Sequence, residues 1–259
     1  MVLALKLILT PLMITLATLT GRRWGPVISG WLIGFPFTSG PVSLILAMQN
    51  GVPFASQAAI GILGGQLAVL IFCLTYSLLA PRFNWSVSVS CAIIAFFLIT
   101  WVSNLFTLSL LPVSLLVILL TVLVIRLIPR TDLPPETLHP PKWDIPARIL
   151  IATSFVFLLT TFADFLGPQL SGLIAPFPIY SIVLATFAQH QQGPHAARQL
   201  LRGVAFGSFA FISFFIVVAG LLPTFGLLWT YLLAAMVTLL VNGGSLVLTH
   251  RLVSPDSLF

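Results

Sequence analysis

Long apolar runs, separated by short polar or proline-containing segments, follow one another along almost the whole chain. Most of these runs are about 18 to 24 residues long, which is the length of a helix that crosses the hydrocarbon core of a bilayer. The pattern therefore predicts an all-α integral membrane protein with about nine transmembrane helices. The predicted spans are approximately 3–20, 25–48, 57–79, 86–103, 106–126, 147–165, 168–189, 200–221 and 227–247.

The division between the fourth and fifth predicted spans depends on one short polar segment. Residues 86–126 are almost continuously apolar, and a run of about 40 residues is too long for a single crossing. The sequence VSNLFTLS around Asn104 is the only polar segment in this run, so we place a turn there.

The chain contains an internal repeat with a period of 142 residues. When residues 3–104 are laid over residues 145–246 without a gap, many glycine, proline and serine positions coincide. The segment GPVISGWLIGFPFTS opens at Gly25, and its counterpart GPQLSGLIAPFPIYS opens at Gly167. Further matched pairs are Gln49 and Gln191, Gly51 and Gly193, Gln57 and Gln199, Gly61 and Gly203, Gly65 and Gly207, and Pro81 and Pro223. These coincidences indicate a duplication.

Five predicted crossings precede the second copy, so this copy is expected to be upside down in the membrane relative to the first. Residues 1–128 would form the first repeat and a linking fifth helix, and residues 147–259 the second, inverted repeat. Between them, the prolines and mixed charges of residues 129–146 are typical of a solvated linker. Inverted repeats are a common plan of secondary transporters, although architecture alone is a weak argument for function.

Composition and charge agree with a membrane location. Hydrophobic residues make up 59% of the chain and charged residues 6%, whereas a soluble domain has about 25% charged residues. The net charge of +6 does not indicate nucleic-acid binding, because the basic residues are scattered singly and form no patch.

The distribution of basic residues predicts the orientation of the chain. Ten of the eleven Lys and Arg residues fall on one side of the nine-span arrangement, and Lys6 falls on the other. Short cytoplasmic loops concentrate Lys and Arg. We therefore expect the N-terminus outside and the C-terminus in the cytoplasm, in the inner (plasma) membrane of a bacterium.

Each repeat carries a Phe-Pro pair near the middle of its second helix. Proline removes a backbone N–H and clashes with the carbonyl four residues back, so the second and seventh spans are expected to be broken or kinked. In an inverted pair the two breaks would approach each other near mid-membrane, where half-helix ends carry partial charges. The predicted solute-binding residues are Ser29, Phe35, Pro36, Thr38, Ser39, Ser171, Phe177, Pro178, Tyr180 and Ser181.

Structural roles remain open for these motifs. Membrane helices also use Ser and Pro for kinks and close packing. Gln49 and Gln191 follow the broken spans and are candidates for gating the two mouths of the site, with helix capping as the alternative. GILGG at 61–65 and GVAFG at 203–207 place glycines on one helix face, which predicts close packing against the broken helices.

The sequence predicts no catalytic, metal or cofactor site. No acidic residue lies deep in a predicted span, which argues against a carboxylate proton relay. The histidines fall outside the span cores, so no Ser–His pair is evident. The spacing of His190 and His195 does not indicate a metal site.

The sequence therefore favours a secondary transporter or facilitator of a small polar or ionic solute. The alternative is a non-transporting integral membrane subunit or scaffold of a larger complex, in which the motifs build a packed core. The expected partners are the lipid bilayer and the solute, and a second copy of the chain or a membrane partner protein is left open.

Overall fold

The structure, a computed structural model, describes residues 2–106, 109–130, 141, 143–158 and 176–253. Within these residues the backbone forms helices joined by turns and forms no strand. Five segments are helices long and apolar enough to cross a membrane: Leu3–Trp24, Val52–Leu79, Trp85–Asn104, Leu110–Leu127 and Pro194–Gly244. These helices indicate an integral membrane protein of the all-α class.

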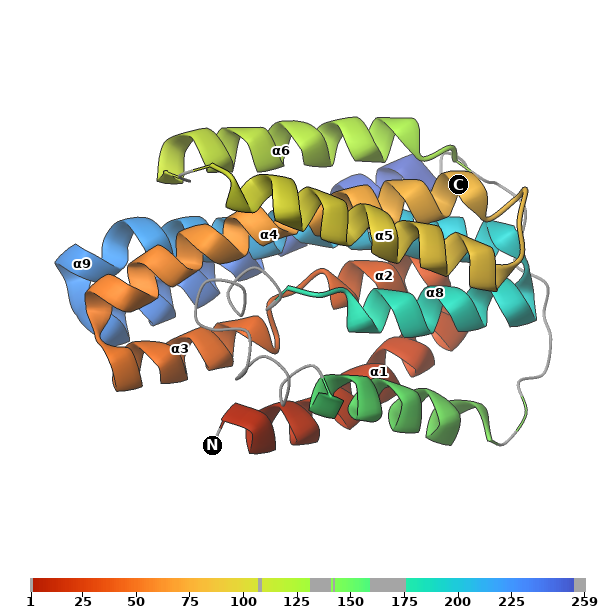
Figure 1. The fold of residues 1–259 in the computed structure, drawn as a ribbon, viewed down its shortest axis with the longest axis horizontal. Helices are drawn as coiled ribbons and strands as arrows, with labels where there is room; N and C mark the ends of the chain where they lie inside the picture. The colour runs from red at the N-terminus through yellow and green to blue at the C-terminus, as the bar shows by residue number, and fades with distance from the viewer. Residues whose placement is uncertain (1, 107–108, 131–140, 142, 159–175, 254–259) are drawn as a thin grey trace.

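The long helices lie lengthwise in one elongated bundle (Figure 1). They are α1 (Val2–Trp24), α4 (Val52–Leu79), α5 (Trp85–Asn104), α6 (Leu110–Leu127) and α9 (Pro194–Val253). Residues 144–158 form a further helix. The turn between α5 and α6 follows Asn104, where the sequence predicted it. Helix α9 contains one non-helical residue, Gly226 (φ 72°, ψ 178°), and therefore consists of two helices that meet there.

The second predicted span consists of two short helices. Helix α2 covers Pro26–Ile33 and α3 covers Ser39–Asn50, and the residues between them are not helical. In the second copy, α8 (Ile179–Gln192) begins directly after Pro178, and residues 168–175 of that span lie outside the described residues. Figure 1 shows that α3 and α8 both start near the middle of the bundle and run toward opposite ends.

A glycine at the same repeat position begins the next helix in each copy. Gly51 precedes α4 with φ 83° and ψ 169°, and Gly193 precedes α9 with φ 84° and ψ 174°. Glycine adopts a positive φ at no steric cost, unlike other residues. The α3–α4 and α8–α9 connections therefore share one turn geometry, which the matching glycines make possible.

Helices α4 and α9 contact each other through the same positions of the two copies. The Ser56 hydroxyl donates to the Ala219 carbonyl oxygen at 2.8 Å, and Arg198 Nε donates to the Ser77 carbonyl oxygen at 2.8 Å. Ser56 and Arg198 are 142 residues apart, and so are Ser77 and Ala219. The two hydrogen bonds are thus reciprocal. Equivalent positions of the two copies act as the donor, and equivalent positions act as the acceptor.

Between these two bonds, one residue meets its own counterpart. Gln66 Nε2 donates to Ser208 Oγ at 2.9 Å, and these two residues are also 142 apart. Both side chains are almost completely buried. A two-fold axis between the two copies would bring a residue on that axis into contact with its own equivalent, and this contact has that property.

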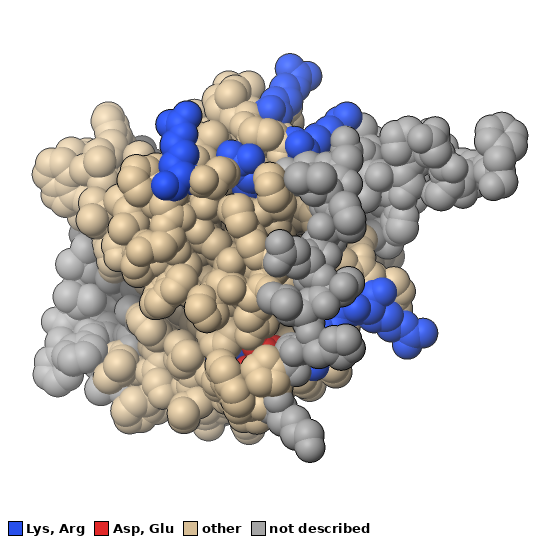
Figure 2. All heavy atoms as spheres, turned by 90° about the vertical axis from the view of Figure 1, so that its right-hand side faces the viewer, with Lys and Arg blue, Asp and Glu red and all other residues tan. Residues whose placement is uncertain are grey.

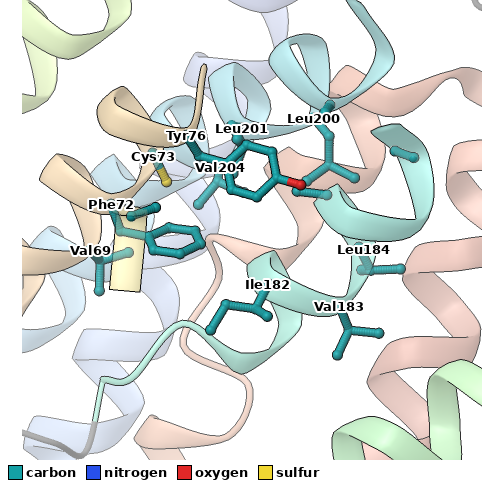
Figure 3. Close-up of a cluster of buried hydrophobic side chains, with 14 of the residues drawn as sticks. Val69, Phe72, Cys73, Tyr76, Ile182, Val183, Leu184, Leu200, Leu201 and Val204 are labelled. Carbon is teal, nitrogen blue, oxygen red and sulfur yellow. The ribbon is translucent and has the colours of Figure 1, made fainter. Parts of the chain in front are cut away.

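Two clusters of buried hydrophobic side chains flank this interface. In one, side chains of α4, α8 and α9 surround Phe72 and Leu184 (Figure 3). In the other, α4, α6 and α9 contribute residues such as Leu63, Val117 and Phe215. Several members correspond at the repeat spacing: Phe72 and Phe214, Ala80 and Leu222, Ala92 and Ala234, Ala197 and Ala55, Leu201 and Ala59, and Val204 and Ile62. The duplicated pattern therefore extends to the packing of the core.

The glycines of α9 bring the backbone of α2 into direct contact with it. A methyl group on Gly203 would overlap the Val27 carbonyl oxygen, and one on Gly207 would overlap the Trp31 carbonyl oxygen. The prediction of close glycine packing against the broken helix is thus confirmed for GVAFG, whereas a methyl group on Gly61 of GILGG would meet nothing within 4 Å. This packing fixes the end of α2 beside α9, next to the start of the break.

Candidate functional site

A cavity of about 90 Å³ lies between the two Phe-Pro motifs. An engineered apolar cavity of about 150 Å³ holds benzene, so this one suits a solute of only a few non-hydrogen atoms. Both copies contribute to its wall, together with side chains of α1, α4 and α9. The predicted binding residues that line it are Phe35, Thr38, Ser39, Phe177, Pro178, Tyr180 and Ser181.

Two of the predicted binding residues that the structure describes do not contribute to this wall. Ser29 is buried in α2, and its hydroxyl donates to the Ala17 carbonyl oxygen at 2.7 Å, which ties α2 to α1. Pro36 is buried at the break without lining the cavity. Ser171 lies outside the described residues. Apart from Ser29 and Pro36, the cavity therefore brings together all of the predicted binding residues that the structure describes.

The backbone makes the same turn at both breaks. The Phe37 amide donates to the Phe35 carbonyl at 2.9 Å, as the Ile179 amide does to the Phe177 carbonyl at 2.8 Å. One step further, the Gly40 amide donates to the Pro36 carbonyl at 2.9 Å and the Ile182 amide to the Pro178 carbonyl at 2.8 Å. Every donor and every acceptor in one pair is 142 residues from its equivalent in the other.

Backbone amides at the starts of α3 and α8 are left without an acceptor. The first residues of a helix have N–H groups with no intrahelical partner, and neither helix has a side chain that caps its start. Within the described chain, the amides of Thr38, Ser39, Tyr180 and Ser181 donate to no acceptor. They occupy matching positions in the two copies, and all four residues line the cavity.

Hydroxyl and amide side chains add polarity to the wall, and aromatic rings form much of the rest of it. The Tyr180 hydroxyl lies 3.3 Å from Thr10 Oγ1 and also interacts with the Thr38 side chain. Phe35 stacks on Phe37 with ring centroids 4.3 Å apart. Gln66, at the α4–α9 contact, also lines the cavity. Among the described residues, no charged side chain does so.

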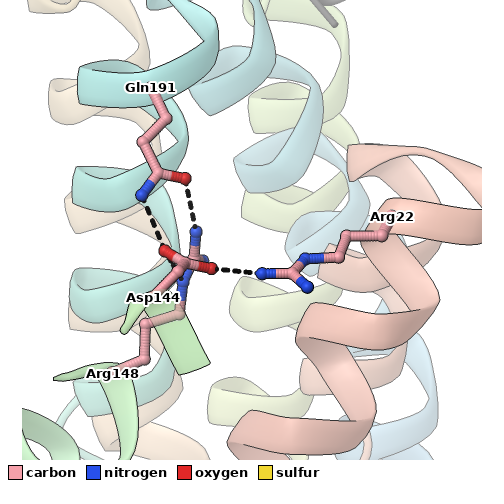
Figure 4. A network of polar contacts seen from close by, with 4 residues as sticks. All are labelled: Arg22, Asp144, Arg148 and Gln191. Carbon is pink, nitrogen blue, oxygen red and sulfur yellow. Dashed lines mark hydrogen bonds and ion pairs between the residues drawn. The ribbon is translucent and has the colours of Figure 1, made fainter. Parts of the chain in front are cut away.

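A buried ionic network joins three helices away from the cavity (Figure 4). Asp144, which is 0% exposed, accepts from Arg22 Nη2 at 2.7 Å, from Arg148 Nε at 2.9 Å and from Gln191 Nε2 at 2.6 Å. Arg148 Nη2 also donates to Gln191 Oε1 at 3.1 Å. The network links the end of α1 and the end of α8 to the helix that starts at residue 144.

The surroundings of Asp144 favour its ionised form. Burial raises the pKa of this carboxyl, but the hydrogen bond from Gln191 and the charges and hydrogen bonds of Arg148 and Arg22 outweigh that effect. The resulting pKa lies below the usual value of 3.8. Asp144 is therefore the fixed negative centre of the network.

The two candidate gating glutamines occupy different environments. Gln191 belongs to the Asp144 network, whereas Gln49 is exposed at the end of α3. Neither lines the cavity. The gating role of both residues stays a prediction. For Gln191, the Asp144 network is the place where this role would be exerted.

Sequence reasoning did not single out Gln66 or Asp144. Gln66 could have been found from the sequence, because it is a polar residue within the apolar stretch GGQLAVL. The four-residue spacing of Asp144 and Arg148, typical of an ion pair on one helix, was the signal for the second.

Basic side chains gather at the end of the bundle where α1 and α6 finish and α9 begins (Figure 2). Arg198 lies close enough to Arg82 for their charges to interact, and Arg202 lies similarly near Arg130. The one-sided charge distribution in the sequence thus corresponds to one end of the molecule.

No family model matches the chain, and no curated protein or solved structure is significantly similar to it. The class that the fold and the site define is an all-helical membrane protein with a small cavity between the starts of α3 and α8.

Proposed function

We propose that the protein is a secondary transporter or facilitator of a small polar or ionic solute in the inner (plasma) membrane of a bacterium. The solute site is the cavity between the starts of α3 and α8. One observation carries the proposal: equivalent positions of the two copies, each with unpaired amides, wall the same cavity. A packed structural core would instead satisfy its polar groups internally.

An inverted arrangement of the two copies underlies this proposal. The opposite directions of α3 and α8 (Figure 1) and the reciprocal α4–α9 hydrogen bonds support it. In transporters with inverted repeats, solute sites lie near the bilayer midplane where discontinuous helices of the two repeats meet. The gathering of basic residues at one end supports a cytoplasmic location for that end.

Alternating access follows from such an arrangement. Two copies that contact each other through equivalent positions can exchange conformations, so that the mouth open in one state is closed in the other. The Asp144 network ties α1 and α8 together at the basic end. We assign to it the closing of the cytoplasmic mouth.

Cysteine accessibility tests the proposal. In a chain whose Cys73 and Cys91 have been replaced, single cysteines are introduced at Ser39 and Ser181, and a small membrane-impermeant thiol reagent is added from each side. An aqueous pathway predicts labelling at both positions from at least one side. A cysteine at the buried Thr121 should stay unlabelled, and one at the exposed Asn84 should react.

The opposite pattern would refute the solute site. If Asn84 reacts while Ser39 and Ser181 resist the reagent from both sides, the motifs are packed protein. Co-purification of a stoichiometric membrane partner would then support a non-transporting subunit or scaffold instead.

A further inference from the structure

We infer that the solute held in this cavity is a small anion with a single negative charge. The inference rests on the proposed function, since it names the chemical class of the solute for the same site. It depends on the balance of donors and acceptors in the wall, on one buried hydroxyl, and on the size and charge of the cavity.

The donors in the wall have no protein acceptor. Thr38 and Ser39 at the start of α3, and Tyr180 and Ser181 at the start of α8, each present a backbone amide that is unpaired within the described chain. Buried amides are almost always paired, so unpaired amides in a cavity wall indicate a ligand that accepts hydrogen bonds.

Four acceptors at the two turns, in contrast, are already engaged. The carbonyl oxygens of Phe35 and Pro36 accept backbone hydrogen bonds, and so do those of Phe177 and Pro178. A cation would need free carbonyl or carboxylate oxygens. At the two turns these four carbonyls are paired, and no acidic side chain among the described residues lines the cavity.

The Ser181 side chain provides an independent indication. Ser181 is only 2% exposed, it lines the cavity, and its hydroxyl makes no hydrogen bond within the described chain. A buried hydroxyl without a partner costs free energy. An anion at the start of α8 would accept from this hydroxyl and from the amide of the same residue.

The partial positive charges at the two helix starts determine how much negative charge the site can balance. Each helix N-terminus acts as roughly half a positive charge, so two of them balance about one negative charge. Among the described residues, no Lys or Arg lines the cavity to neutralise a second one, and an uncompensated buried charge is costly. With a volume of about 90 Å³, the site therefore suits a halide or a monovalent oxyanion or carboxylate of a few atoms.

Anion binding is measured on the full-length protein in neutral detergent, from its thermal unfolding midpoint. Sodium chloride, sodium nitrate and sodium formate each replace sodium gluconate at constant ionic strength, and formamide serves as the neutral analogue of formate. We expect a saturable rise of the midpoint with at least one small anion and none with gluconate or formamide. The same response to all salts, or a response to formamide alone, would overturn the inference.

A pair of variants at Ser181 separates charge from size. In Ser181→Asp the new carboxylate would itself occupy the start of α8, and Ser181→Asn has the same size without the charge. At neutral pH we expect Ser181→Asp to unfold at a higher temperature than Ser181→Asn. We also expect the response of the Ser181→Asp unfolding midpoint to the anion to be at least tenfold weaker. A lower midpoint for Ser181→Asp would mean that the site repels negative charge, and the inference would fail.

Flux measurements in proteoliposomes separate this inference from the proposed function. Chloride, nitrate and formate are compared with the neutral solutes urea and glycerol. Saturable anion binding without flux of any solute would leave the anion site standing and remove the transport function. Protein-dependent flux of urea or glycerol, with no anion response, would leave the transport function standing and remove the anion site.

Discussion

Gln66 donates a hydrogen bond to Ser208 across the interface of α4 and α9, and the two residues are repeat counterparts 142 positions apart. Gln66 also lines the cavity, while Ser208 is 0% exposed. One hydrogen bond thus joins the contact between the two copies to the wall of the candidate site.

Removing the Ser208 hydroxyl should destabilise the protein by about 1–3 kcal/mol, because the buried Gln66 amide would lose its acceptor. The measurement is the free energy of unfolding of Ser208→Ala in detergent. Ser114→Ala is the matched control, since the Ser114 hydroxyl donates to the carbonyl four residues back, as the Ser208 hydroxyl does. Equal effects in both variants would mean that the Gln66 bond contributes nothing.

Adding a methyl group at Gly203 should separate α2 from α9. The new Cβ would overlap the Val27 carbonyl oxygen, and overpacking of this kind costs about 1–3 kcal/mol. Gly220→Ala, in the same helix, would meet only a flexible Leu110 side chain at 3.4 Å. It should be neutral or stabilising by up to about 1 kcal/mol, given the higher helix propensity of alanine. Unfolding of both variants in detergent tests this contrast.

Loss of the Asp144 charge should be more damaging than loss of a surface charge nearby. Asp144→Asn leaves the buried Arg148 without its counter-ion, and breaking a buried pair from one side costs about 3–5 kcal/mol. Arg23→Gln, which removes only an exposed cation over the Trp24 ring, should change the unfolding free energy by less than about 1 kcal/mol. Similar losses in the two variants would contradict the assignment of Asp144 as the centre of the network.

The contribution of Asp144 should depend on pH in a definite direction. Its pKa is lower in the folded protein than the usual 3.8, so the unfolded chain binds the proton more readily. The stabilisation is therefore complete above the usual pKa and is lost as the pH falls through the lower, folded pKa. The difference in unfolding free energy between the wild type and Asp144→Asn should be constant above about pH 5 and shrink in more acidic solution. A difference that grows on acidification would have the wrong sign.

Weakening the network should open the cavity from the basic end. In the background with Ser181→Cys and no other cysteine, Gln191→Ala removes the link between α8 and Asp144. We expect severalfold faster labelling of the new cysteine from the cytoplasmic side only. Gln49→Ala, at the matching exposed position, serves as the control. An unchanged rate in Gln191→Ala would remove the gating role of this residue.

Much of the helical framework could be predicted from the sequence because it depends on local properties. The length of apolar runs located the long helices, and the polar segment at Asn104 located the turn between α5 and α6. The Phe-Pro pair located the end of regular helix between α2 and α3, since proline excludes a normal helical bond.

The remaining features depend on which distant segments meet. Asp144 was assigned to a solvated linker, but it is completely buried because α1, α8 and its own helix converge on it. Ser29 was assigned to the site because it is polar and repeated, yet its hydroxyl is used by the α1–α2 contact. Residue type and spacing alone do not distinguish these tertiary roles.

The contact of Gln66 with Ser208 also bears on how the two copies came to differ. In a symmetric dimer of identical chains, a residue on the two-fold axis must meet itself, so glutamine would face glutamine and serine would face serine. Joining both copies in one chain removes this restriction. Gln66 and Ser208, like Tyr180 and Thr38, are unlike residues that meet across repeat-equivalent positions. A single chain can thus place different residues at the two equivalent positions of the cavity wall, which identical chains related by a two-fold axis cannot do.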